Sequence, residues 1–403
     1  MKKINYILVI LFAIILCTSR VSFSQGVKVQ FINTAFENAS QFNWEIDSNG
    51  SIVADLIYDH ERSSANRANQ HWNFQVQATP GADLTFILRN FDNIWNGKKS
   101  LPISERTPCF ISRDNKNWSA IKTELISGNR LRFNIHMDGE KLYVASVEPY
   151  RISDLQKLIS AIKNNPLVDI KFIGKTSEGR PLEIIRIGNP NAPYCVFLRG
   201  RAHGWESGGN WVEEGLIRGL LQKDAGHYLK KYCVYILPMA NKDAVAQGRT
   251  RFNARGMDLN RNWDKPADLL LCPENYFLEN WLRQMISKGK KPDLAIDLHN
   301  DANGQLHVSH PNGNSEKYFS NAKRFESLLR RHTWFTEGTT GADFRNPGSI
   351  GEGLVERFGI DAFILEFNFE WIAGLKKVPF SEDWELMGKK LRDVFLDYFK
   401  EDD

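Results

Sequence analysis

A chain of 403 residues is long enough for two domains or one large one, and for a sizeable core. Its formal net charge of +4 falls to about +1 once the three basic residues of the leader, Lys2, Lys3 and Arg20, are set aside. No basic patch of the kind that nucleic acids bind is visible, so we expect no nucleic-acid partner.

The start of the chain has the pattern of a cleavable export signal. Two lysines precede an apolar run over residues 7–16, and a small-x-small cleavage site follows at residues 22–24. The apolar run is short for a bilayer span, and bulky Leu16 before Cys17 disfavours a lipid-modified cysteine. We therefore predict a signal peptide over residues 1–24, a periplasmic or secreted protein, and no membrane span after cleavage.

Residues 25–148 are predicted to form an all-β sandwich, because short strand-like segments follow one another without a helical period. The expected strands cover residues 27–32, 71–78, 83–90, 130–137 and 141–147. Asp138-Gly139-Glu140 predicts a hairpin between the last two. We interpret the tryptophans of this region as packing residues, with ligand binding as the alternative. They are Trp44, Trp72, Trp95 and Trp118.

From residue 149 to residue 403, strands and helices alternate, which predicts an α/β domain with a mixed sheet and helices on both faces. A capping box that begins at Ser153 predicts the first helix. Short apolar runs typical of buried strands cover residues 168–176, 181–188, 194–198, 232–238, 294–298 and 362–367. Further helices are expected over residues 211–222, 273–287, 316–332 and 381–399.

Three polar features lie at or near the ends of these apolar runs, where open α/β sheets place their sites. His203 and Glu206 follow one run, His299 ends another, and Glu366 lies within a third. Two histidines and one glutamate form a three-ligand zinc set that leaves a coordination position open for water. Taken singly, an H-x-x-E pair is more often a solvated turn than a metal site, and a histidine such as His299 at a strand end is more often a hydrogen-bonded structural residue than a ligand. A buried Glu366 needs a partner, either a metal-bound water that it deprotonates or an arginine.

The segment over residues 249–264 gathers four arginines, several amides and only two acids. Guanidinium groups bind carboxylates with two parallel hydrogen bonds and stabilise oxyanions. A solvated basic loop is the alternative. The run D-L-N-R-N-W over residues 258–263 argues against it, because a loop that needs only solubility does not require so particular a sequence.

With these pieces in chain order, the sequence resembles the zinc metallocarboxypeptidases of the carboxypeptidase A type. The motifs are H-G-W-E, G-M-D-L-N-R-N-W, I-D-L-H and the strand glutamate, and the resemblance covers roughly residues 150–400. It implies one Zn²⁺ per chain. The ligands would be His203, Glu206 and His299, and Asp258 would accept a hydrogen bond from His203 and orient it.

The resemblance also implies roles toward a peptide substrate. Asn260 and Arg261 would bind the free C-terminal carboxylate. Arg251 would polarise the scissile carbonyl and stabilise the tetrahedral oxyanion. Glu366 would act first as general base and then as general acid.

Within that family, the R-x-H-x-x-E-S-x-x-x-W motif and the preceding β-rich region resemble the cytosolic-carboxypeptidase-like subfamily, of which this chain would be an exported bacterial member. Two departures stand out. No tyrosine lies between Tyr318 and Tyr398, where many relatives carry one on a mobile loop, so Phe344 is expected to face that space. Glu352 lies where deglutamylating relatives have an arginine. An acid there would attract a basic C-terminal residue, unless Glu352 points to solvent or caps the following helix.

The sequence therefore predicts a zinc-dependent metallocarboxypeptidase that acts on the C-termini of peptides or proteins and prefers basic C-terminal residues. The alternative enzyme is a peptidoglycan stem-peptide carboxypeptidase or amidase of the same fold. An acyl-amino-acid hydrolase fits the motifs less well. A zinc-free binding protein has no support, since every metal, base and substrate position is filled.

Overall fold

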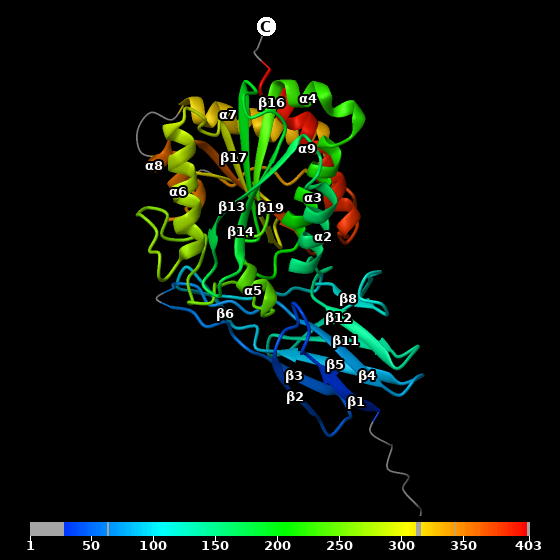
Figure 1. The fold of residues 1–403 in the computed structure, drawn as a ribbon. Helices are drawn as coiled ribbons and strands as arrows, with labels where there is room; N and C mark the ends of the chain where they lie inside the picture. Colours follow the sequence, from blue (N-terminus) through cyan, green and yellow to red (C-terminus); the bar gives the residue numbers. More distant parts are fainter. Residues whose placement is uncertain (1–27, 63, 312–315, 342, 401–403) are drawn as a thin grey trace, which may run out of the picture.

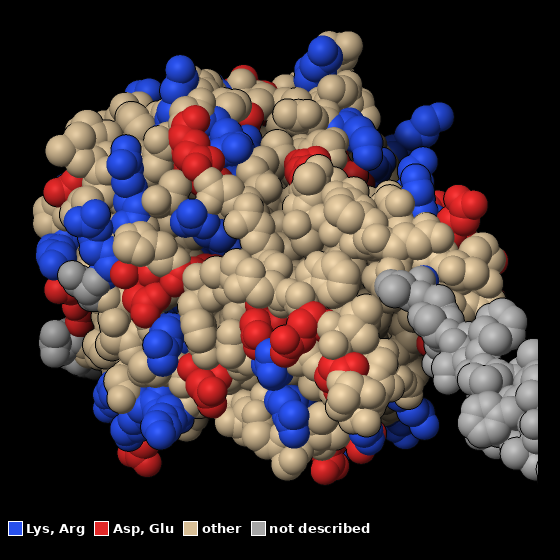
Figure 2. Space-filling model, turned by 90° about the horizontal axis from the view of Figure 1, so that it is seen from below, with Lys and Arg blue, Asp and Glu red and all other residues tan. Residues whose placement is uncertain are grey.

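The structure is a computed structural model that describes residues 28–400 apart from residues 63, 312–315 and 342. The predicted signal peptide lies outside these residues, so export stays a prediction. Within the described part of the chain, no helix is long and apolar enough to cross a membrane. Figure 1 shows a β-sandwich at one end of the molecule and an α/β region at the other. On the face shown in Figure 2, acidic and basic side chains are interspersed.

The N-terminal region consists of two five-stranded sheets that share one apolar core. The first sheet has the order β1 (Val29–Asn33), β4 (Asn73–Ala78), β12 (Lys141–Ala145), β8 (Cys109–Ser112) and β9 (Ser119–Ile121). The second has the order β10 (Glu124–Ile126), β11 (Arg130–His136), β5 (Asp83–Arg89), β3 (Ile52–Leu56) and β2 (Phe42–Ile46). Aromatic rings join the two sheets: Phe86 of β5 lies 5.4 Å, between ring centroids, from both Phe74 of β4 and Phe133 of β11. The predicted β-sandwich is confirmed.

The predicted hairpin between β11 and β12 is wrong. β11 pairs with β5 and β10, whereas β12 pairs with β4 and β8 in the other sheet. The turn over residues 138–140 therefore carries the chain from one sheet to the other. A turn signal indicates where the chain reverses, but not which sheet receives the next strand. A true hairpin is formed elsewhere, by β6 (Asn93–Trp95) and β7 (Lys98–Ser100).

The α/β region is built on a seven-stranded mixed sheet, as predicted. Its order is β13 (Val168–Lys175), β14 (Pro181–Ile187), β16 (Tyr232–Leu237), β15 (Tyr194–Gly200), β17 (Leu294–Asp301), β19 (Asp361–Asn368) and β18 (Leu306–Val308). The four central strands β16, β15, β17 and β19 run parallel to one another. Their residues are almost all buried because helices cover both faces.

One face of the sheet packs against α2 (Ile152–Ile162), α3 (Gly208–Leu220), α4 (Gly226–Lys231), α7 (Glu316–His332) and α9 (Ser381–Tyr398). The other face packs against α6 (Pro273–Ser287) and α8 (Ile350–Phe358). Short helices η1 (Lys223–Ala225) and α5 (Lys242–Ala246) lie in connections. The predicted bounds of α6 and α7 are confirmed. The predicted capping box is wrong: α2 starts before Ser153, and the Asp154 carboxylate accepts the Arg151 N–H at 3.0 Å.

Candidate active site

The three candidate metal ligands come from the carboxyl ends of two neighbouring parallel strands. β15 ends at Gly200, and the chain turns through His203 and Glu206 before α3 begins. His299 lies near the end of β17, the parallel neighbour of β15. The exposed fractions of the three residues are 2%, 3% and 0%, and their ligand atoms lie within 4.8 Å of one another. The structure thus brings together the residues that the sequence singled out.

The turn that carries His203 and Glu206 is packed too closely for side chains at its glycines. A Cβ on Gly204 would lie 2.5 Å from the Arg249 carbonyl oxygen, and a Cβ on Gly209 would lie 2.9 Å from the Leu298 Cβ. Small residues at these positions therefore let the turn approach its neighbours closely enough to place both ligands.

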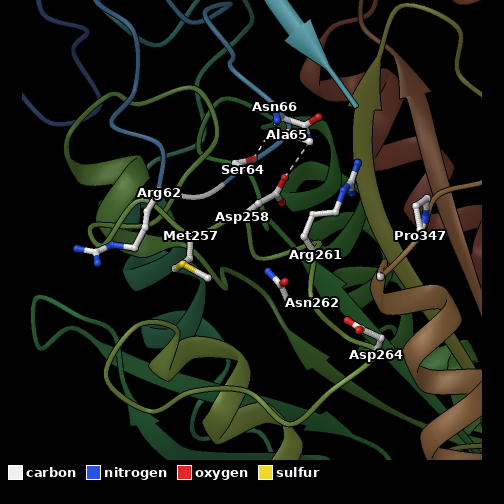
Figure 3. A pocket seen from close by; sticks show the side chains of 11 residues that line it. Arg62, Ser64, Ala65, Asn66, Met257, Asp258, Arg261, Asn262, Asp264 and Pro347 are labelled. Carbon is white, nitrogen blue, oxygen red and sulfur yellow. Dashed lines mark hydrogen bonds between the residues drawn. The ribbon is translucent and has the colours of Figure 1, made fainter. Parts of the chain in front are cut away.

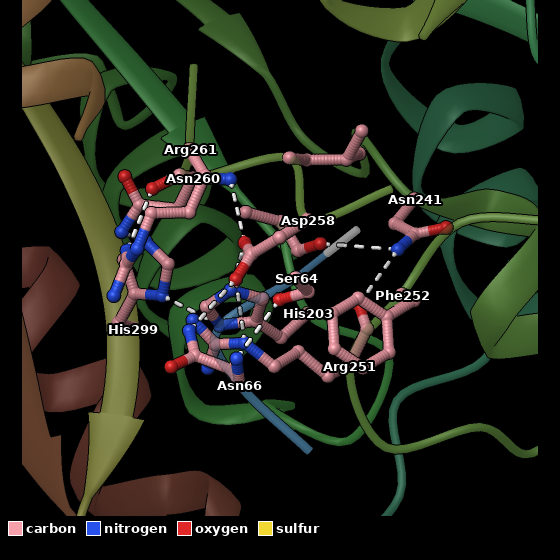
Figure 4. A network of polar contacts seen from close by, with 12 residues as sticks. Ser64, Asn66, His203, Asn241, Arg251, Phe252, Asp258, Asn260, Arg261 and His299 are labelled. Carbon is pink, nitrogen blue, oxygen red and sulfur yellow. Dashed lines mark hydrogen bonds and ion pairs between the residues drawn. The ribbon is translucent and has the colours of Figure 1, made fainter. Parts of the chain in front are cut away.

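Each histidine presents Nδ1 to Glu206 and uses Nε2 to contact a second carboxylate. His203 Nδ1 lies 2.6 Å from Glu206 Oε1, and His299 Nδ1 lies 2.8 Å from Glu206 Oε2. On the far side of each ring, His203 Nε2 lies 3.2 Å from Asp258 (Figure 4), and His299 Nε2 lies 2.6 Å from Asp297. Ligating histidines are commonly oriented by such a carboxylate. The buried nitrogen and oxygen donors, facing one point, fit a zinc ion and leave a position free for water.

Two buried arginines hold these orienting carboxylates. Arg199 donates two hydrogen bonds to Asp297, both of 2.6 Å, and Arg251 donates from Nε to Asp258 at 2.7 Å. Burial opposes the charge on Asp258, but Arg251 and His203 outweigh it and hold the pKa of that carboxyl well below its usual range. The pKa of Asp297 is lowered in the same way, against burial, by Arg199 and then by His299. Both carboxylates therefore stay charged and can accept a proton-bearing Nε2.

Glu366 lies beside His299 on the next parallel strand, since β17 and β19 pair these two residues in register. Its Oε2 atom is buried and has no hydrogen-bond partner in the described part of the chain. Burial, followed by the charge of Asp301, raises the pKa of Glu366 well above its usual range. A carboxyl group of this kind can take up a proton near neutral pH and release it again.

Of these groups, His203, Glu206 and Glu366 line one cleft of about 480 Å³, with walls from both the N-terminal region and the α/β region. The α/β wall includes Arg251, whose buried Nη2 atom has no hydrogen-bond partner among the described residues. It also includes Asn260, whose side-chain oxygen accepts the Ile350 N–H at 3.0 Å. Arg261 is placed differently, because it lines a neighbouring cavity of about 300 Å³ (Figure 3). Its guanidinium nevertheless lies over Trp95, which lines the cleft.

Comparison with known proteins agrees with this geometry. Residues 155–334 match the family model described as zinc carboxypeptidase. The matched stretch includes His203, Glu206 and His299, the three candidate metal ligands. A metallo-carboxypeptidase from Burkholderia cenocepacia shares the fold, with a TM-score of 0.80 and 20% identity, covering 92% of this chain and 98% of that chain. A second, from Pseudomonas aeruginosa in complex with (2-guanidinoethylmercapto)succinic acid, has a TM-score of 0.76 and 20% identity, covering 92% of this chain and 100% of that one.

Among curated sequences, human cytosolic carboxypeptidase 2 is 24% identical over 282 residues, which make up 65% of this chain and 31% of that protein. The chain therefore spans about a third of the length of this relative. The sequence resemblance to zinc carboxypeptidases is confirmed by the family match over residues 155–334 and by the shared fold.

The two departures from the family pattern both lie beside the cleft. Phe344 stacks on His307 with ring centroids 4.5 Å apart, and both rings line the cleft. Glu352 lies in the first turn of α8, where its carboxylate accepts the Gly348 N–H at 2.9 Å. It also lines a small cavity together with His307 and Phe344. Glu352 thus contributes to the start of α8 and borders the cavity at the same time.

The sequence analysis missed several residues that complete this carboxypeptidase site. Asp297 and Arg199 gave a usable signal, since each is a charged residue inside an apolar strand and so requires a buried partner. Asp59 gave none: this sandwich residue accepts hydrogen bonds from three successive N–H groups, those of residues 250–252. Trp95, interpreted as a packing residue, is 40% exposed and lines the cleft.

Proposed function

We propose that this chain is a zinc-dependent carboxypeptidase that removes the C-terminal residue from peptides or proteins. The observation that carries the proposal is the buried triad of His203, Glu206 and His299 next to Glu366, whose buried carboxylate oxygen has no partner in the described part of the chain. When bound, zinc supplies a Lewis acid that makes water nucleophilic near neutral pH.

The residues of the chain supply the remaining steps. Glu366 takes a proton from the attacking water and gives it to the departing amine, which its raised pKa favours. Arg251 offers the unpaired Nη2 atom to the oxygen that gains charge as the carbonyl becomes tetrahedral. Asn260 and Arg261 bind the terminal carboxylate, so that only the last peptide bond reaches Glu366.

A digest of a peptide library with the zinc-loaded enzyme, read by mass spectrometry, tests the reaction. We expect products shortened by single residues from the C-terminus, and no products from peptides whose C-terminus is amidated. Cleavage inside the peptides, or equal cleavage of amidated peptides, would contradict the proposal.

We further propose that the cavity beside Glu352 receives the side chain of the departing residue and favours Lys or Arg. Glu352 is half-buried there, and one of its carboxylate oxygens accepts a hydrogen bond from the Gly348 N–H. A charge in a half-buried position attracts an amine and repels a carboxylate. The cavity, of about 10 Å³, holds about one water. A long side chain therefore requires Phe344, which lines the cavity, to move.

Substitution of Glu352 by Gln separates this preference from the reaction itself. We expect kcat/KM for peptides ending in Lys to fall about tenfold, with peptides ending in Phe unchanged, because one charge pair is lost. Glu356→Gln, one turn further along α8, is the matched control. A wild-type preference for C-terminal Glu would refute the charge argument and leave the reaction untouched.

A further inference from the structure

The β6–β7 hairpin, a separate two-stranded sheet of the N-terminal region, reaches the cleft through Trp95. Its two-residue turn, Asn96-Gly97, has φ values of 47° and 76°, as a tight hairpin turn requires. A hairpin of this length is only marginally stable alone. Here it is fixed to a neighbouring segment, because Ile94 and Arg67 exchange two backbone hydrogen bonds of 2.9 Å, and Gly97 N–H donates to Ala65 at 2.8 Å. The hairpin therefore presents Trp95 at a defined position.

Two guanidinium groups lie on the ring of Trp95. The Cζ atom of Arg251 is 4.9 Å from the ring centroid, and that of Arg261 is 5.0 Å from it. Both distances are within the range in which a cation is attracted to the face of an indole. The next hairpin residue adds a polar contact, since Arg261 Nη2 donates to Asn96 Oδ1 at 3.4 Å.

These two arginines differ in how firmly the α/β region alone holds them. Arg251 has a charged partner there, because its Nε donates to Asp258. The Arg261 side chain donates to its neighbour's carbonyl, that of Asn260, at 2.7 Å, and the charge of Asp258 attracts it without the direct hydrogen bond that Arg251 makes. The hairpin adds the contacts with Asn96 and Trp95. Burial lowers the pKa of Arg261 to about 10, and the nearby charge of Arg251 acts in the same direction, whereas Asp258 opposes them. A ring that attracts both cations offsets the repulsion between them.

We infer that Trp95 is a positioning residue of the active site, which holds the guanidinium groups of Arg251 and Arg261 for the substrate carboxylate and the oxyanion. The N-terminal sandwich is then part of the catalytic machinery and not only a covering domain. The inference rests on the proposed function for the roles of the two arginines. It predicts a larger effect on substrate binding than on turnover, because Arg261 depends on the hairpin more than Arg251 does.

The test compares four full-length, zinc-loaded variants. Trp95→Ala removes the ring, Trp95→Leu keeps apolar bulk without a π face, and Trp95→Phe keeps a smaller ring. Trp44→Ala is the matched control, since Trp44 is also 40% exposed but lies on β2, outside the cleft lining. Binding of (2-guanidinoethylmercapto)succinic acid is measured by calorimetry, and KM and kcat are measured with peptides.

We expect the Ala and Leu variants to raise KM and the dissociation constant of the dicarboxylate roughly tenfold, with kcat within about threefold of wild type. The Phe variant and the Trp44 control should stay within about twofold on both measures, and zinc content should be unchanged throughout. If Trp95→Leu behaves like wild type in both assays, the inference is wrong. If the wild type binds the dicarboxylate but releases no residue from any peptide, the proposed function fails, while the binding comparison still decides the role of Trp95.

Discussion

Asp297 contacts both Arg199 and His299, so the substitution Asp297→Asn should have two effects with different causes, one on the stability of the protein and one on its affinity for zinc. In Asp297→Asn, Arg199 keeps its charge in a site where its exposed fraction is 0%, but it loses the opposite charge and at least one of the two hydrogen bonds of 2.6 Å, because an amide has only one accepting oxygen. Removing one partner of a buried ion pair costs about 3–5 kcal/mol. The same change removes the carboxylate that orients His299, which lowers metal affinity about 10–100-fold. Urea unfolding of the zinc-free protein measures the first effect, and competition with a chelator measures the second.

A second substitution distinguishes the two causes. Arg199→Met combined with Asp297→Asn removes the unpaired charge, so the double variant should regain part of the lost stability but none of the zinc affinity. Asp293→Asn, immediately before the same strand, is the matched control, because an amide oxygen can still accept the Cys195 N–H that Asp293 Oδ2 accepts at 2.7 Å. The reasoning is refuted if Asp297→Asn stays within about 1 kcal/mol of wild type and binds zinc as tightly.

Three further predictions concern the residues around the site. Burial lowers the pKa of His71 to about 4, so the unfolded chain takes up its proton first as the pH falls. The free energy of unfolding should therefore be independent of His71 protonation above pH 6.5, and this residue should lower it by about 3 kcal/mol by pH 4. Urea titrations at several pH values should show a shallower pH dependence of that free energy for His71→Gln, and identical pH dependences would contradict this. Asp59→Ala leaves three backbone donors without their acceptor and should cost at least about 3 kcal/mol in the free energy of unfolding, together with a fall in kcat/KM. A smaller loss would mean that water replaces the carboxylate. Gly204→Ala forces the ligand turn away from a carbonyl oxygen 2.5 Å from the new Cβ, and should cost about 1–3 kcal/mol and weaken zinc binding. Gly226→Ala, where a Cβ meets nothing within 4 Å, is its control and should behave as wild type.

Much of the α/β region follows from local sequence. Strands covered on both faces consist of short apolar runs, and α6 and α7 have apolar positions at helical spacing, so both kinds of element were predicted. Local sequence could not show whether β11 and β12 pair with each other, because each strand has the same pattern of buried and exposed residues whichever sheet it joins. The choice between sheets depends on long-range packing, which a turn tripeptide does not encode.

The candidate site divides in a similar way. His203, Glu206, His299 and Glu366 were found because the ends of parallel strands meet at one edge of the sheet. The contribution of the N-terminal region was not found, since Asp59 and Trp95 act on the loop over residues 249–264 from more than 150 positions away along the chain. Neither residue belongs to a motif, and only the packing of the two regions brings them to the site.

The most direct test of the central claim compares wild type with Glu366→Gln for the release of C-terminal amino acids by zinc-loaded protein. The substitution keeps the shape of the side chain but removes its ability to accept a proton. We predict one zinc ion per chain in both proteins and a rate of release about a thousandfold lower in the variant. A variant that retains zinc and releases amino acids at the wild-type rate would show that Glu366 is not the base and would contradict the proposed mechanism.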